Sequence, residues 1–360
     1  MIPVGGRPRN ERPVNGRLPD RRTVDAWTAD KTVDGWTADK TVDGWTADRT
    51  TADRGNVDGT AGEGSLARTE QRNPRSASID RMSTLDLLHL INTEDRLVPE
   101  AVADVLPEIA AAVELAVAAL SGGHRVHYVG AGTSGRIAVL DAAELIPTFG
   151  LEPGQVVAHI AGGAHALTNP SEAAEDDESA GAAAAADVAA GDVVLGVTAS
   201  GRTPYVHAAL TTARARGART VLVSANRASP IAACADVHIA PDTGPEVVTG
   251  STRMKAGTAQ KLVLNAFSTA TMVRLGRTYS NLMTDMLACN AKLRDRQLRI
   301  LAEAAGADPA RCREVLHAAG GDAKIALVSL ITDASTETAA RALAVTEGHV
   351  NRALRLLRPA

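Results

Sequence analysis

Short apolar runs alternate with longer amphipathic stretches along most of this chain. Runs rich in Val, Ile and Leu are typical of buried parallel strands. They recur over 125–130, 156–161, 192–198, 219–225 and 237–240. Stretches in which apolar residues recur every three or four positions predict helices over 134–146, 170–190, 203–216, 229–234 and 254–275. This alternation predicts an α/β fold: a doubly wound, parallel five-stranded sheet of the flavodoxin-like type.

Helices are also predicted before and after the alternating region. Ser83 is a suitable N-cap for a helix that runs to about Ile91, and a second helix is expected over 99–120. Beyond Leu298 the pattern changes to short helices, over 298–305, 308–319, 322–331, 335–345 and 348–357. The predicted organisation is therefore a sheet domain with N-terminal helices over 76–297, and a small helical subdomain over 298–360.

Residues 1–75 differ from the rest in composition. A nine-residue pattern places Trp27, Trp36 and Trp45 at equal spacing, within Arg, Asp, Gly, Pro and Thr and with few aliphatic residues. Such a segment buries too little apolar surface to offset the entropy of ordering, so a disordered extension is predicted, with a binding motif as the alternative.

Composition excludes several classes of partner and site. A net charge of -4 and an aromatic content of 2% argue against nucleic acid, an anionic membrane and base stacking. The apolar stretch 101–120 carries acidic residues and a proline, and the N-terminus has no apolar signal region. The three cysteines form no C-x-x-C motif, which indicates a reducing compartment without disulfides or zinc. We expect a cytoplasmic protein.

Two glycine- and hydroxyl-rich loops follow predicted strands and precede predicted helices. Helix N-termini with exposed N–H groups and nearby hydroxyls bind phosphate oxygens, so two such loops predict a site for a phosphorylated small molecule. The candidate binding residues are Gly132, Thr133, Ser134 and Arg136 in the first loop, and Thr198, Ser200, Gly201, Arg202 and Thr203 in the second.

Two other interpretations of these loops remain open. Gly130, Gly132 and Gly135 fit the G-x-G-x-x-G pattern of dinucleotide sites, but the next strand ends in Ala161-Gly162-Gly163 without the expected acidic residue. The glycines would otherwise be simple turns between strand and helix. No P-loop motif occurs in the sequence.

A third loop, residues 248–261, leads into a long apolar helix. It combines hydroxyls, glycines and cations, and its candidate ligand residues are Ser251, Thr252 and Lys255. The alternative is that these groups only cap the helix.

These motifs resemble a known family. Gly132-Thr-Ser-Gly-Arg136 and Ala199-Ser-Gly-Arg-Thr-Pro-Tyr205 are similar to sugar-isomerase (SIS) domain loops. Together with the run from Glu246 to Lys261, they resemble the N-acetylmuramic acid 6-phosphate etherases from about Thr69 to the C-terminus. The resemblance implies an enzyme that cleaves the D-lactyl ether at C3 of a phosphorylated amino sugar, without a metal or redox cofactor. It also implies a homodimer.

The resemblance also implies two catalytic acids. Glu144 corresponds to the proton donor and Glu175 to the second active-site acid. Without the resemblance, Glu144 is interpreted equally well as a solvated residue at a helix end, and Glu175 as one residue of a solvated acidic helix face. Leu145 and Ile146 stand where the family has small or prolyl residues.

Two other functions share these loops: a non-catalytic sugar-phosphate sensor and an aldose–ketose isomerase. A sensor needs no acid pair, so Glu144 and Glu175 favour catalysis. An isomerase needs no group for the lactyl carboxylate, for which the candidates are Arg136, Arg202 and Lys255. The histidines are expected to be structural (His124, His127, His159 and His165), except that His207 is a candidate to line the cleft.

Overall fold

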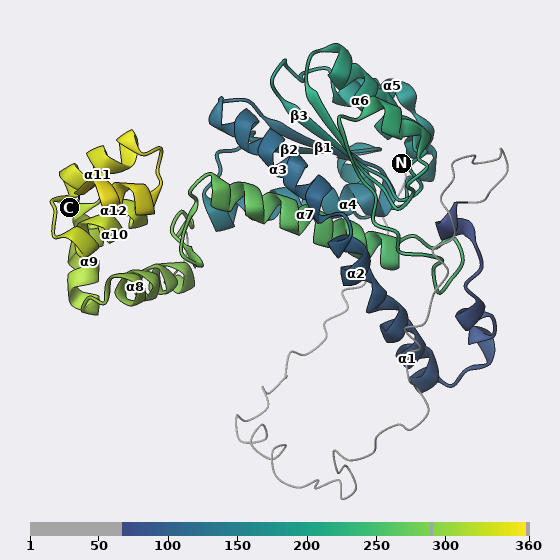
Figure 1. Cartoon of the computed structure of the whole chain (residues 1–360), viewed down its shortest axis with the longest axis horizontal. Coiled ribbons are helices and arrows are strands. Elements are labelled where there is room, and N and C mark those ends of the chain that lie inside the picture. The colour runs from purple at the N-terminus through teal and green to yellow at the C-terminus, as the bar shows by residue number, and fades with distance from the viewer. Residues whose placement is uncertain (1–66, 289–290, 358–360) are drawn as a thin grey trace, which may run out of the picture. The chain divides into compact units, whose positions relative to one another are not determined.

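The computed structural model describes residues 67–288 and 291–357; the tryptophan repeat and Cys289 lie outside these ranges. A five-stranded parallel sheet has the strand order β2-β1-β3-β4-β5 (Figure 1). Its strands are β1 Val126–Gly130, β2 Val156–Ile160, β3 Val193–Val197, β4 Arg219–Val223 and β5 Val237–Ile239. The five predicted strands and the doubly wound α/β fold are confirmed.

Both faces of the sheet are covered by helices. One face packs against α3 (Leu106–Ser121), α4 (Gly132–Phe149) and α7 (Lys255–Arg274), and the other mainly against α6 (Pro204–Ala215). Val126 and Tyr128 of β1 face the first layer, whereas Val129 faces the second. Because the central strands β1 and β3 are buried along their whole length, they form mainly apolar runs in the sequence.

Three helix predictions need correction. The helix expected over 99–120 is divided into α2 (Leu97–Ala103) and α3, because Pro107 lacks an N–H and fits only the first turn of a helix.

The helix expected over 170–190 is instead the 3-10 helix η6 (Glu172–Asp176) followed by the short α5 (Glu178–Ala184). Asp177 starts α5 because its side chain accepts the N–H of Ala180.

The segment 229–234 was expected to be α-helical. It is instead a 3-10 helix, η7 (Pro230–Cys234), which begins at a proline.

An N-terminal strap, residues 67–83, precedes α1 (Thr84–Asp95). It contains the 3-10 helices η2 (Arg68–Glu70), η3 (Pro74–Ser76) and η4 (Ile79–Arg81). Residues 67–75 of the strap had been assigned to the disordered extension, and that assignment is wrong because polar contacts fix them. Arg68 pairs with Asp242 at 2.6 Å, and Asn73 donates to the carbonyl of Pro245 at 3.4 Å.

The C-terminal region is helical, as predicted, and has its own apolar core around Leu301, Leu327 and Leu343. Its helices are α8 Ala291–Ala305, α9 Pro309–Ala318, α10 Ala323–Thr332, α11 Thr336–Val345 and α12 Val350–Leu357. A two-stranded antiparallel hairpin, β6 (Thr278–Tyr279) and β7 (Leu282–Met283), was not predicted. Among the described residues, no helix is both long and apolar enough to span a membrane.

Candidate functional site

The two predicted phosphate loops lie at the topological switch point of the sheet. β1 and β3 are neighbours, and the strand order continues from them in opposite directions, to β2 and to β4. Gly130 and Val197 are register partners, so the loops that follow them start side by side at the carboxyl edge. Open α/β sheets bind ligands at this position.

The first loop leaves the N-terminus of α4 uncapped. The helix begins at Gly132, and no side chain of the described residues caps its first turn. The N–H groups at the start of an α-helix have no partner within the helix, so those of Gly132, Thr133 and Ser134 are suited to an anion. Gly132 has a φ of 53°, and a Cβ added there would meet no atom within 4 Å. The space above this turn is therefore open.

Two further glycines bring this turn close to the sheet. A Cβ on Gly130 would lie 2.9 Å from the nitrogen of Gly135, and one on Gly135 would lie 2.8 Å from the carbonyl oxygen of Gly130. The spacing that suggested a dinucleotide fingerprint thus reflects the close packing of β1 against α4.

Hydrogen bonds between its own hydroxyls hold the second loop. The buried Thr198 and Thr203 hydroxyls lie 2.8 Å apart, and Thr198 also accepts the N–H of Gly201, which has a φ of 67°. Ser200 is half-buried and accepts the N–H of Arg202, whose side chain is exposed. Thr198 and Thr203 therefore shape the loop, whereas the side chains of Ser200 and Arg202 are at least partly exposed and remain candidates to bind a ligand.

The third loop differs, because a carboxylate already occupies the N-terminus of α7. The buried Glu246 side chain accepts the N–H of Lys255 at 3.0 Å and that of Ala256 at 2.9 Å. Burial raises the pKa of Glu246, although the two N–H groups and the Lys255 charge act in the opposite direction. This helix end thus has its anion within the chain, and the alternative of a cap is the correct interpretation for it.

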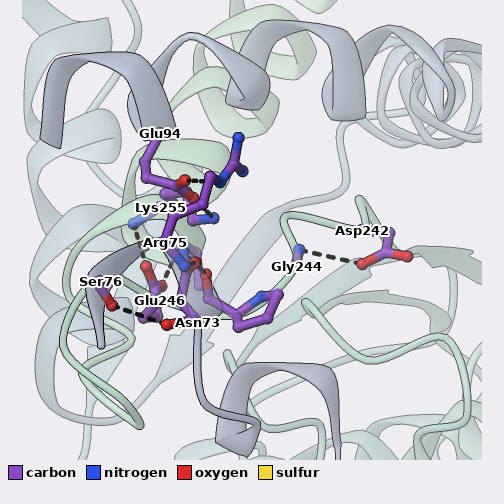
Figure 2. Close-up of polar contacts among 10 residues, drawn as sticks. Asn73, Arg75, Ser76, Glu94, Asp242, Gly244, Glu246 and Lys255 are labelled. Atoms are coloured by element: carbon purple, nitrogen blue, oxygen red, sulfur yellow. Dashed lines mark hydrogen bonds and ion pairs between the residues drawn. The ribbon is translucent and has the colours of Figure 1, made fainter. Parts of the chain in front are cut away.

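Lys255 is not a free cation, contrary to the sequence interpretation. Its side chain is 1% exposed, and its Nζ donates to Glu94 Oε2 at 2.7 Å. Arg75 of the strap pairs with the other carboxylate oxygen of Glu94, also at 2.7 Å. Figure 2 shows Lys255 and Arg75 both reaching toward Glu94. Lys255 therefore fixes α7 to α1 and has no exposed face for a phosphate.

Ser251 and Thr252 remain half-buried candidates beside the first loop. A Cβ on Gly257 would lie 3.3 Å from the Thr252 carbonyl oxygen and 3.6 Å from the Thr133 side chain. The end of the third loop and the start of α4 are thus adjacent.

Glu175 lies on η6, in the connection between β2 and α5. This connection borders the second loop, because η6 contacts α6, the helix that follows that loop. Tyr205 lies in the first turn of α6, and its pKa is raised by burial and then by the negative charge of Asp177. Partial desolvation, followed by the charges of Asp176 and Glu172, raises the pKa of Glu175. A carboxyl group with a raised pKa is suited to proton transfer near neutral pH.

Glu144 is exposed and lies twelve residues beyond Gly132 on α4. At the rise of an α-helix this separation is about 18 Å. The structure therefore does not bring Glu144 to the N-terminus of the helix that carries it.

Sequence reasoning missed Asp141, one turn before Glu144. Its carboxylate accepts from the hydroxyls of Tyr128 at 3.0 Å and Ser268 at 3.1 Å, which joins β1, α4 and α7. Burial raises the pKa of Asp141. The available signal in the sequence was an aspartate at a position that the apolar pattern of the helix places on its buried side.

The histidines are structural where the fold buries them. The rings of His127 and His159 stack, their Nδ1 and Nε2 atoms lie 3.1 Å apart, and burial lowers the pKa of both. His207, in the first turn of α6, is exposed. Within the described residues, no group of three or more His, Cys, Asp or Glu side chains is placed to hold a metal ion.

Comparison with known proteins agrees with this geometry. The SIS domain family matches residues 164–270, and the glucokinase regulatory protein N-terminal SIS domain matches residues 108–214. An N-acetylmuramic acid 6-phosphate etherase from Thermobifida fusca is 60% identical over 74% of this chain and 88% of its own. The etherase from Pectobacterium atrosepticum is 51% identical over 79% of this chain and 95% of its own. The chain belongs to the N-acetylmuramic acid 6-phosphate etherase family.

Proposed function

We propose that this protein cleaves the D-lactyl ether of N-acetylmuramic acid 6-phosphate, giving N-acetylglucosamine 6-phosphate and D-lactate, in the cytoplasm and in cell-wall amino-sugar recycling. The observation that carries the proposal is the uncapped start of α4 beside the second loop, at the switch point of the sheet. This arrangement suits a phosphate monoester. Membership of the family supplies the rest of the substrate.

The phosphate would be held by the N–H groups of Gly132, Thr133 and Ser134, with Ser200 opposite them. These donors fix the sugar by its 6-phosphate and leave C2 and C3 to meet the acids. Ser251 and Thr252, adjacent to the first loop, would complete the wall of the site.

The reaction would proceed by elimination and then hydration. In the ring-opened sugar the aldehyde makes the C2 proton acidic, and a carboxylate removes it. The C3–O bond then breaks as an acid protonates the ether oxygen, and lactate leaves. Water then adds across the resulting double bond, its oxygen to C3 while a proton returns to C2, which gives N-acetylglucosamine 6-phosphate. Glu175, whose pKa is raised, and Glu144 would perform these transfers.

A homodimer would complete the site. About 18 Å of helix separates Glu144 from the phosphate turn of its own chain, which supports a role for this residue in a cleft formed with a second copy. The exposed Leu85 and Leu88 on α1 supply an apolar surface of the kind that subunit contacts cover.

The test is D-lactate release from N-acetylmuramic acid 6-phosphate by the intact chain and by Glu144→Gln. We expect lactate from the intact chain, and a rate lower by about 100-fold to about 10,000-fold in the variant, the usual effect of losing a general acid. Because Glu144 is exposed, the variant should unfold at the same temperature as the unmodified protein.

Glu303→Gln, which removes another exposed carboxylate, on α8, is the matched control and should keep the full rate. A folded chain that binds the sugar phosphate but releases no lactate would be a sensor and not an etherase. A full rate in Glu144→Gln would remove Glu144 from the mechanism.

A further inference from the structure

Arg136 connects the phosphate turn to the segment that carries Glu175. It lies in the first turns of α4, two residues after Ser134. Its Nε donates to the carbonyl of Leu167 at 3.1 Å, and its Nη2 donates to the carbonyl of Asn169 at 2.9 Å. Both acceptors belong to the connection between β2 and η6: Leu167 ends the 3-10 helix η5 (Gly163–Leu167), and Asn169 follows it.

This connection has few other polar attachments, although Ala174 of η6 packs against the apolar cluster beside α6. Between residues 162 and 176 only Ala166 is buried, and the regular structure consists of two short 3-10 helices. Among the described residues, the hydrogen bonds that tie this stretch to another element are the two from Arg136; the rest join residues of the same stretch or its flanks. Short 3-10 helices have poor hydrogen-bond geometry and depend on outside contacts.

The guanidinium group is well suited to this task. Its planar fork donates two N–H groups to two carbonyls in fixed directions, which a lysine ammonium does not reproduce. Both acceptors are backbone carbonyls, so the contact positions the backbone of this connection and leaves the positive charge of Arg136 without a neutralising carboxylate.

We infer that Arg136 is a positioning residue that holds the Glu175 segment against the phosphate turn, in place of the direct ligand role expected from the sequence. The inference rests on the proposed catalytic role of Glu175. It means that the turn that binds the phosphate also sets the position of one acid, so Arg136 acts on turnover through Glu175.

The test measures kcat and KM for lactate release in Arg136→Gln, Glu175→Gln and the double variant. Arg136→Gln should lower kcat about tenfold or more while KM stays within about threefold, because substrate binding is kept and the reactive geometry is lost. The double variant should be no slower than Glu175→Gln alone, within about threefold, since two residues that act through one group are not additive. Arg136→Lys should recover little of the rate.

Arg214→Gln is the matched control, since Arg214 also donates to a backbone carbonyl, that of Ala233 at 2.9 Å, but between α6 and η7. It should leave both constants unchanged. A glutamate-specific protease should cleave after Glu172 faster in Arg136→Gln than in Arg214→Gln. This measurement does not depend on the catalytic activity of either variant.

Three outcomes would overturn the inference. A raised KM at unchanged kcat would make Arg136 a substrate ligand, and a double variant slower by the product of the two single effects would separate it from Glu175. Full turnover in Glu175→Gln would refute the catalytic role of Glu175 itself, and the inference with it; the first two outcomes leave that role intact.

Discussion

The first turns of α4 and α7 follow similar glycine- and hydroxyl-rich loops, yet they serve opposite purposes. At α4 the leading N–H groups are uncapped and face open space above Gly132. At α7 the equivalent groups bind the Glu246 carboxylate, and the nearby cation, Lys255, is buried against Glu94. The same property of a helix N-terminus is therefore left available to an anion at α4, where we propose the phosphate binds, and is used within the fold at α7.

Two carboxylates at very different distances in sequence make this difference. Glu246, which accepts from the leading N–H groups of α7, lies nine positions before Lys255. Glu94 lies 161 positions before its partner Lys255. The cap of α7 thus comes from its own loop region, whereas the burial of the Lys255 charge depends on a residue distant in sequence. Three predictions test this contrast.

The largest effect is expected from Lys255→Met. The variant leaves the buried Glu94 carboxylate with Arg75 as its remaining cation, and breaking a buried ion pair by removing one partner costs about 3–5 kcal/mol. Chemical denaturation should show this loss in the free energy of unfolding, while KM for the sugar phosphate stays unchanged in the folded fraction.

Two further variants make the result specific. Lys292→Met removes an exposed lysine on α8 and should leave stability unchanged. Adding Glu94→Leu to Lys255→Met should recover part of the lost stability, because the orphaned carboxylate is gone. A stable Lys255→Met protein with a strongly raised KM would return Lys255 to the substrate site.

An intermediate effect is expected from Gly132→Ala, compared with Gly250→Ala. Both glycines have positive φ, 53° and 76°, so each substitution should cost about 1–2 kcal/mol of stability. Only at Gly132 would the new methyl group enter the open space over a helix N-terminus. We expect KM to rise about tenfold for Gly132→Ala, corresponding to about 1.4 kcal/mol, and to stay unchanged for Gly250→Ala. Equal rises in KM would show that the third loop also holds the phosphate.

The smallest effect concerns the pH dependence of Glu246. Its pKa is raised in the folded protein, mainly by burial, so the folded state binds this proton more tightly than the unfolded state. The contribution of Glu246 to stability therefore increases as the pH falls from 7 through 4.5, and Glu246→Gln lacks this pH dependence.

Unfolding free energies at pH 7 and pH 5 should show the unmodified protein gaining stability relative to Glu246→Gln on acidification. The opposite change would mean that the charge of the cap outweighs its burial.

The sheet was predictable because its central strands, β1 and β3, are buried along their whole length and all five strands are rich in β-branched apolar residues. Errors arose where one polar or imino residue overrides helical periodicity. Pro107 divides the stretch 99–120, and the Asp177 cap restarts a chain that composition alone extends from 170 to 190. Residues 67–75 of the strap were missed because short 3-10 helices held by ion pairs have no periodic signal.

The candidate site was predicted to the same extent. The hydroxyl loops were located, because strand, glycine and helix signals coincide there. Which residues of these loops are free to bind a ligand was not predicted. Thr198 and Thr203 form a hydrogen bond with each other, and Lys255 pairs with a carboxylate distant in sequence. The roles of Glu144 and Glu175 came from family resemblance and remain predictions.

The strap has a consequence for how the protein is made. Arg68 and Asp242 are 174 positions apart, and Glu94 and Lys255 are 161 apart. At a synthesis rate of about 5–20 residues per second, the strap leaves the ribosome roughly 10 to 30 s before its partners exist. During this interval its cations and the Glu94 carboxylate stay in water, and the sheet can assemble without them. The segment of the described chain that is translated first is thus among the last to reach its native contacts.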